Sequence, residues 1–191
     1  PQAIEAAAFE AWPALENETL HGWRLRFARG YTKRANSANG LPGAQELDAD
    51  GIGAIEARYR AHGLPPIFRL TSFGAPPGID GELAARGYRL VDPSLVMTMP
   101  VDADRSAGMP ALADDVEAWL DAFEQVSGRI GAGQATHLSL LRAIRHPRAL
   151  ALARAGGVPV ATALAVLVGD RLGLFDVATH PGHRRQGHAG Q

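Results

Sequence analysis

The residues best suited to chemistry lie in a glycine-rich loop near the C-terminal end of the sequence, between Thr179 and Gly190. Its core follows the pattern Arg184-x-x-Gly187-x-Ala189. Small residues let the backbone turn tightly and approach a ligand, and successive N–H groups in such a turn form a concave nest for anions. Arginines add positive charge and forked donors. A diphosphate is the ligand that uses all these features at once.

Two other phosphate-binding motifs are excluded for this loop. It has no Gly-Lys-Ser/Thr ending, so it is not a Walker-type P-loop. It also lacks the Gly-x-Gly-x-x-Gly spacing of a dinucleotide fingerprint. An arginine- and glycine-rich surface turn is the remaining alternative for the loop taken alone.

The elements before the loop must position it. Two helices are predicted first, one beginning near Val116 with Asp114 as its cap, and one over Thr136–Ile144. Three strands follow at close spacing, and the pairs Gly156-Gly157 and Gly169-Asp170 favour tight turns between them. The predicted antiparallel meander comprises Ala149–Arg154, Val160–Val168 and Leu172–Ala178.

This order of elements, ending in a strand and an Arg-x-x-Gly-x-Ala loop, resembles the GNAT superfamily of N-acetyltransferases. The resemblance implies an α/β (α+β) fold with a mixed, mostly antiparallel central sheet flanked by helices. It implies acetyl-CoA as co-substrate, and transfer of its acetyl group to a primary amine of a small molecule or peptide. A non-catalytic GNAT-like module that binds CoA or forms dimers is the alternative function.

The resemblance also assigns roles to residues. The backbone of Val177, Ala178 and Thr179 would pair with the pantetheine arm. The pyrophosphate would be held by Arg184, Arg185, Gln186, Gly187, His188, Ala189 and Gly190. Asp176, directly before this segment, is the candidate for a general base or an amine-binding anion. An ordinary strand carboxylate engaged in a hydrogen bond is the alternative for Asp176.

The first half of the chain is predicted to alternate helices and strands. The segment Leu83–Leu90, with Gly87-Tyr88 after a short helix, resembles the closing motif of GNAT domains. We therefore expect an N-terminal, degenerate GNAT-like half domain over 1–100, a linker over 101–111 and the first part of a GNAT acetyl-CoA-binding domain over 112–191. The predicted elements are Ile4–Trp12, Gly22–Arg29, Asp50–His62, Pro66–Thr71, Ile79–Arg86 and Leu95–Met99.

The sequence ends at Gln191, inside or just after the loop, whereas a GNAT domain continues with a further helix and strands. We expect either a truncated C-terminal domain or an incomplete stretch of a longer protein. A circular permutation, in which the N-terminal half supplies the missing strands, is a third alternative.

Composition sets the broad class. The chain has 19 Lys and Arg against 20 Asp and Glu, which argues against a nucleic-acid partner. It has no cysteine, which excludes disulfides and thiolate catalysis. The longest apolar stretch, Val158–Val168, is too short to span a membrane. We expect a cytoplasmic bacterial enzyme with a small amine substrate, no membrane partner and no metal, for which a homodimer is one compatible assembly.

Several other residues invite a function and also have a simpler explanation. The loop histidines His180, His183 and His188 suggest a metal, but no carboxylate lies nearby in sequence, which favours solvated side chains. The polar run Arg34–Asn39 could line a substrate pocket or form a turn network. A basic stretch could hold an acidic substrate or the 3′-phosphate of CoA, or be a solvated strand face; it comprises Arg24, Arg26, Arg29, Lys33 and Arg34. The tryptophans, Trp12, Trp23 and Trp119, are predicted core residues.

Overall fold

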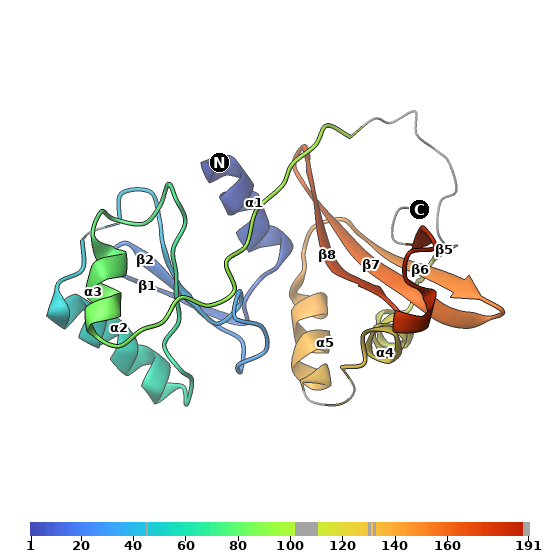
Figure 1. The fold of residues 1–191 in the computed structure, drawn as a ribbon, viewed down its shortest axis with the longest axis horizontal. Coiled ribbons are helices and arrows are strands. Elements are labelled where there is room, and N and C mark those ends of the chain that lie inside the picture. Colours follow the sequence, from blue (N-terminus) through green and yellow to red (C-terminus); the bar gives the residue numbers. More distant parts are fainter. Residues whose placement is uncertain (45, 102–110, 130, 132, 189–191) are drawn as a thin grey trace.

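The computed structural model describes residues 1–44, 46–101, 111–129, 131 and 133–188. Within these ranges the chain has an α+β fold with five α-helices and two four-stranded, mostly antiparallel sheets (Figure 1). The predicted α+β class is therefore confirmed, with two sheets in place of one central sheet.

The first sheet has the strand order β1-β2-β3-β4. Its strands are β1 (Glu16–Leu20), β2 (Trp23–Phe27), β3 (Ala38–Gly40) and β4 (Phe68–Arg69). The first two pairs are antiparallel and β3 pairs with β4 in parallel. Helices α2 (Ala49–Ala61) and α3 (Ile79–Ala85) share one apolar core with this sheet, centred on Trp23, Leu25 and Ile55.

The second sheet has the order β5-β6-β7-β8 and is antiparallel throughout. Its strands are β5 (Ala111–Leu112), β6 (Arg148–Ala155), β7 (Val158–Val168) and β8 (Arg171–Thr179). Helices α4 (Val116–Ser127) and α5 (Gln134–Ala143) pack beside it. Because β8 is the last strand, one row of its backbone groups has no neighbouring strand in the described part of the chain.

The N-terminal segment joins the two sheets. Helix α1 (Gln2–Ala11) contacts β7 and β8 of the second sheet, and in Figure 1 it lies beside the upper part of that sheet. Ala11 and Trp12 are buried in the same cluster as Leu164 and Val166 of β7. The free edge of β8 therefore faces residues from the first half of the chain, and this junction positions the candidate site.

Most of the predicted elements are confirmed, two predictions are wrong, and the strands β1, β3 and β5 were not predicted. Leu95–Met99 forms no strand; the segment has no strand partner among the described residues, and Leu95 and Met97 are almost fully exposed. The N-cap of α4 is Asp115 rather than Asp114, because the Asp115 carboxylate accepts from two backbone N–H groups of the first turn. The polar sequence of β1 gave no strand signal, yet β1 forms by pairing along its whole length with β2.

The predicted linker lies almost wholly outside the described residues, since 102–110 are not described. Ala111, its last residue, already belongs to β5, which pairs with β6. The division of the chain into two domains stays a prediction. No helix of the described residues is long and apolar enough to cross a membrane.

Candidate functional site

The candidate site is centred on a bulge in β8. Phe175 lies opposite Leu164, whereas Ala178 lies opposite Thr162, so Asp176 and Val177 together face a single residue of β7. Asp176 has a φ of 48°, in the left-handed region that few non-glycine residues adopt. A bulge re-aims side chains and interrupts the alternation of a strand. Here it turns the carboxylate of Asp176 toward the junction with the first half of the chain.

The Asp176 carboxylate is held by a buried histidine. His137 of α5 lies with its Nε2 2.8 Å from Asp176 Oδ2, and its Nδ1 lies 2.7 Å from the hydroxyl of Tyr31. The His137 side chain is 1% exposed and that of Asp176 is 14% exposed. Three residues far apart in sequence, from α5, β8 and the loop after β2, therefore form one continuous hydrogen-bonded chain.

The direction of these hydrogen bonds follows from the chemistry of the groups. An ionised carboxylate only accepts, so His137 donates from Nε2–H to Asp176. With its single ring proton at Nε2, the imidazole accepts at Nδ1, and Tyr31 donates its O–H. Burial, together with the charge of Asp176, raises the pKa of Tyr31 to about 12, which keeps this hydroxyl protonated near neutral pH. Tyr31 thus orients the His137 ring, and His137 in turn donates to Asp176 Oδ2 and holds the carboxylate in place.

Aromatic rings fix the imidazole in place. Tyr31 stacks on His137 at 4.8 Å between ring centroids, and Phe123 of α4 meets it edge-on at 5.2 Å. Gly133, just before α5, has a φ of 98°, and a Cβ there would lie 2.6 Å from the Tyr31 ring. A glycine is therefore required for the close approach of the α5 N-terminus to Tyr31.

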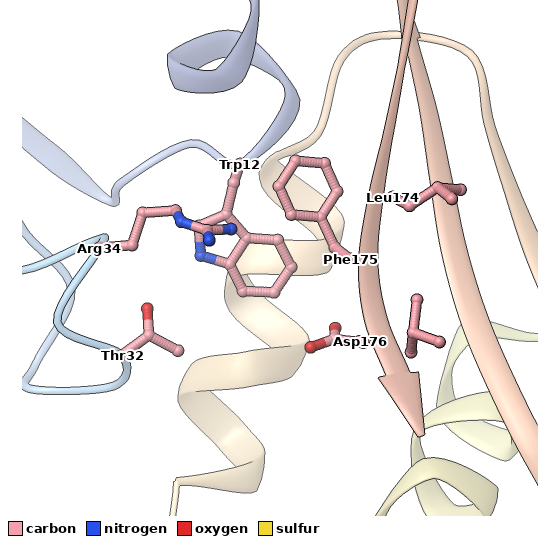
Figure 2. A pocket seen from close by; sticks show the side chains of 7 residues that line it. Trp12, Thr32, Arg34, Leu174, Phe175 and Asp176 are labelled. Atoms are coloured by element: carbon pink, nitrogen blue, oxygen red, sulfur yellow. The ribbon is translucent and has the colours of Figure 1, made fainter. Parts of the chain in front are cut away.

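A first pocket lies on one side of Asp176, between β8 and the first half of the chain. It measures about 340 Å³ and is lined by Trp12, Thr32, Arg34, Leu174, Phe175, Asp176 and Val177. Figure 2 shows Arg34 and Thr32 on one side and Phe175 and Asp176 on the other, with the Trp12 ring between them. Trp12 stacks on Phe175 at 5.4 Å, and the Arg34 guanidinium lies 5.5 Å from the Phe175 ring centroid. We call this the junction pocket.

A second pocket follows β8 toward its C-terminal end. It measures about 580 Å³ and is lined by Phe123, Val126, Ser127, Arg129, Asp176, Val177, Ala178, Thr179 and Arg184. It brings the predicted cofactor-binding residues Val177, Ala178 and Thr179 together with Arg184. We call this the strand groove. Asp176 and Val177 line both pockets, so the two hollows meet at the bulge.

The glycine-rich loop continues from the strand groove. A short 3₁₀ turn covers Pro181–His183, and Arg185 and Gly187 both have positive φ, at 60° and 81°. A Cβ at Gly187 would meet no atom of the described residues within 4 Å. Arg185 and Gln186 are exposed. The predicted ligands Ala189 and Gly190 lie outside the described residues.

The loop histidines pack against one another. His180 and His183 have ring centroids 5.8 Å apart, and those of His183 and His188 are 6.0 Å apart. The Nε2 atom of His188 is buried, and no hydrogen-bond partner is found for it within the described ranges. Among the described residues, no group of three or more histidine, aspartate or glutamate side chains is placed to hold a metal ion.

The basic stretch near β2 is not a solvated strand face throughout. Arg26 is 1% exposed, and its guanidinium donates to the backbone carbonyls of Trp12 and Arg34. Burial and the neighbouring arginines lower the pKa of Arg26 to about 10. Asn36 forms the turn network that the polar run suggested, because its side chain binds four backbone groups of residues 28–32. All three tryptophans are buried, as predicted, and Trp12 lines the junction pocket as well.

The family of the chain can be identified once this geometry is described. Residues 2–191 match the family model described as "Probable histone acetyltransferase Rv0428c C-terminal". The chain belongs to this family. The sequence-based prediction of an acetyltransferase family is confirmed at that level, and no curated protein or solved structure matches the chain.

Sequence reasoning identified Asp176 and the strand groove but missed His137 and Tyr31. One signal for His137 was present: on a helix it shares a face with Leu140 and Leu141, so it occupies an apolar stripe. A histidine buried in such a stripe needs polar partners. Those partners lie 39 and 106 residues away, and only the fold shows which they are.

Proposed function

We propose that the protein is an N-acetyltransferase of the GNAT type, which transfers an acetyl group from acetyl-CoA to the primary amine of a small molecule. One observation carries this proposal: the strand groove and the junction pocket meet at Asp176 and Val177. A two-substrate transfer needs two sites that open onto one reacting centre, because proximity and orientation lower its barrier. The family description, which specifies a probable histone acetyltransferase, supports acetyl transfer but names a protein rather than a small-molecule acceptor.

The strand groove fits acetyl-CoA by its chemistry. Its edge strand leaves backbone groups of β8 available to pair with the amides of a pantetheine arm. Arg129 and Arg184 line the same groove and carry charge suited to phosphates. Beyond it, the positive φ values of Arg185 and Gly187 give the turn that points N–H groups into a concavity. Acetyl-CoA, when bound, supplies the acetyl group as an activated thioester.

Asp176 is the group placed to act on the acceptor amine. Its side chain is mostly buried, and one oxygen is occupied by His137, which leaves the other oriented toward the pockets. The carboxylate attracts the ammonium form of the amine and accepts its proton, directly or through a water. The neutral nitrogen then forms the new C–N bond while the thioester C–S bond breaks. The CoA thiolate leaves and takes up the second proton that the nitrogen loses, so that the products are the amide and free CoA. His137 and Tyr31 position the carboxylate.

Mass spectrometry with isotope-labelled acetyl-CoA tests the proposal. The full-length protein is incubated with acetyl-CoA carrying a labelled acetyl group and a panel of primary amines. We expect the label in an amide product and an equal amount of free CoA. Acetyl-CoA binding without any labelled amide would instead support the non-catalytic module, and an absence of both would contradict an acetyl-CoA site.

A further inference from the structure

The junction pocket has a distribution of charge that selects among amines. Asp176 supplies its negative charge, and the Arg34 guanidinium supplies a positive charge in the same pocket. Among the described residues these two groups form no ion pair, although the charge of Asp176 does act on Arg34. The Arg34 guanidinium lies over the Phe175 ring, and no hydrogen-bond partner is found for it in the described ranges. Because the two charged groups line one pocket without direct contact, a ligand that carries a positive and a negative group can lie between them.

Further arginines lie near Arg34, outside the residues that line the pocket. Arg24 and Arg26 both lie over the Phe9 ring, at 4.8 and 5.1 Å from its centroid, and Arg26 donates to the Arg34 carbonyl. Arg69 also acts on Arg26 and Arg34 through its charge. Two carboxylates of the described residues act on Arg26 or Arg34: Glu5, which pairs with Arg69 on this side, and Asp176 across the pocket. The excess of guanidinium groups on the Arg34 side attracts an anion to this side of the pocket.

The position of Arg34 separates it from the phosphate-binding elements. Arg129 and Arg184 line the strand groove, whereas Arg34 lines only the junction pocket, on the other side of Asp176. The pocket volume of about 340 Å³ suits a small molecule. Trp12 and Phe175 supply apolar walls for the part of the ligand between its two charged ends.

We propose that the acceptor is a small primary amine that carries an anionic group, a carboxylate or a phosphate, with its nitrogen at Asp176 and its anion at Arg34. This inference rests on the proposed acetyl transfer, because it names the acceptor for that reaction. A guanidinium binds either anion through paired N–H donors, so the two share one recognition chemistry. Thr32, which lines the same pocket, provides a further hydroxyl donor on the Arg34 side.

The test uses matched pairs of acceptors with the full-length protein. Amino acids are compared with their amides, and phosphoethanolamine with ethanolamine, so that each pair differs in the anionic group. We expect kcat/KM to be about 10- to 100-fold higher for the anionic member, the range expected for a hydrogen bond to a charged group. The carboxylate and phosphate pairs show separately which anion is preferred.

Arg34→Met should reduce that preference to within about threefold, since the charged partner is lost. The KM for acetyl-CoA should stay unchanged. Arg34→Lys should restore part of the preference, because it keeps the charge without the forked donors. Arg89→Met is the matched control: Arg89 is exposed and lies outside both pockets.

Three results would overturn the inference. The first is an equal kcat/KM for the neutral and the anionic member of each pair. The second is a higher kcat/KM for a lysine-rich peptide than for any anionic amine. The third is a higher KM for acetyl-CoA in Arg34→Met. Titration calorimetry with phosphoethanolamine and with ethanolamine reads the anion subsite without turnover. If transfer is absent but phosphoethanolamine binds in an Arg34-dependent manner, the transferase proposal fails and the anion subsite stands. If both amines bind equally, the subsite itself is wrong.

Discussion

The Asp176 centre and the glycine-rich loop at 180–188 occupy the two ends of one site, and they are built differently. Asp176 is held by a buried histidine, a tyrosine and a ring of aromatic contacts from both halves of the chain. The loop is largely exposed, and its Gly187 faces open space. The first arrangement fixes the position of the Asp176 carboxylate through its hydrogen bond to His137. The second leaves exposed backbone and arginine side chains within reach of a ligand, although Arg184 Nε also donates to the Thr179 carbonyl.

This difference separates two kinds of function. A group that transfers a proton must be preorganised, because small misplacements cost rate. A site for a flexible, multiply charged ligand can be open, because much of its affinity comes from charge and backbone donors. Substitutions at the Asp176 centre should therefore affect rate and stability, whereas substitutions in the loop should affect cofactor binding alone.

The largest expected effect is that of Asp176→Asn. An amide cannot accept the proton of the amine, so kcat should fall about 10²- to 10⁴-fold, the range for loss of a general base. The KM for acetyl-CoA should change little. Asp170→Asn removes the same charge from an exposed turn next to β8 and should leave the rate unaltered. Steady-state release of CoA measures both, and equal rates for the two variants would remove Asp176 from the mechanism.

The second-largest expected effect is a loss in the free energy of unfolding, and it differs between two histidines. His137→Ala removes a buried ring with two hydrogen bonds and leaves Asp176 without its donor, so the free energy of unfolding should fall by about 2–4 kcal/mol. His183→Ala, in the loop, should change it by less than about 0.5 kcal/mol. Urea denaturation gives both values. Similar losses for the two variants would show that the loop is as tightly integrated as the centre.

The glycine-rich loop could be predicted from the sequence, whereas the contacts around Asp176 could not. The loop pattern and the meander before it are local, since turn residues and strand periodicity are read over short windows. Asp176 was found because it precedes the loop. The bulge could not be predicted, because the register shift depends on how β7 and β8 pair. The Tyr31–His137 contact could not be predicted either, because it joins residues that are 106 positions apart in sequence.

The sequence-based predictions of two other segments were also wrong or missing because strand formation depends on a pairing partner. The alternation in Leu95–Met99 satisfied the local strand pattern, but a strand also needs a partner, and none is present among the described residues. Conversely, β1 has a polar sequence and forms because β2 supplies a partner along its full length. The sequence could not distinguish Arg34, the proposed anion-binding residue, from Arg26, because the burial of Arg26 and the exposure of Arg34 arise only in the fold.

A smaller effect concerns the packing that holds Tyr31 on His137. Gly133→Ala would place a Cβ against the Tyr31 ring, and we expect it to cost about 1–3 kcal/mol more than Gly131→Ala. Gly131 is a matched control because it also has a positive φ, 90°, but its Cβ would meet no atom within 4 Å. Urea denaturation compares the two. Equal costs would mean that Tyr31 adjusts freely and is not fixed by α5.

The smallest effect is a dependence of stability on alkaline pH. The pKa of Tyr31 is raised by burial to about 12, so the folded protein keeps a proton that the unfolded chain releases near pH 10. Stability from this group is present below pH 10 and is lost as the pH rises toward 12. Tyr31→Phe should make that decline shallower, as followed by the urea midpoint from pH 9 to 12. An unchanged slope would contradict the burial of the hydroxyl against His137.

The central claim is that the strand groove and its loop hold acetyl-CoA beside Asp176, and titration calorimetry of the full-length protein with acetyl-CoA tests it most directly. Gly157→Val is the control for Gly187→Val, because both glycines have positive φ, 84° and 81°, and open space at the Cβ position. We predict that the wild-type protein and Gly157→Val bind acetyl-CoA alike, and that Gly187→Val weakens binding at least about tenfold by filling the anion nest. Absence of binding to the wild-type protein at millimolar acetyl-CoA, or equal affinities for the two variants, would contradict the account.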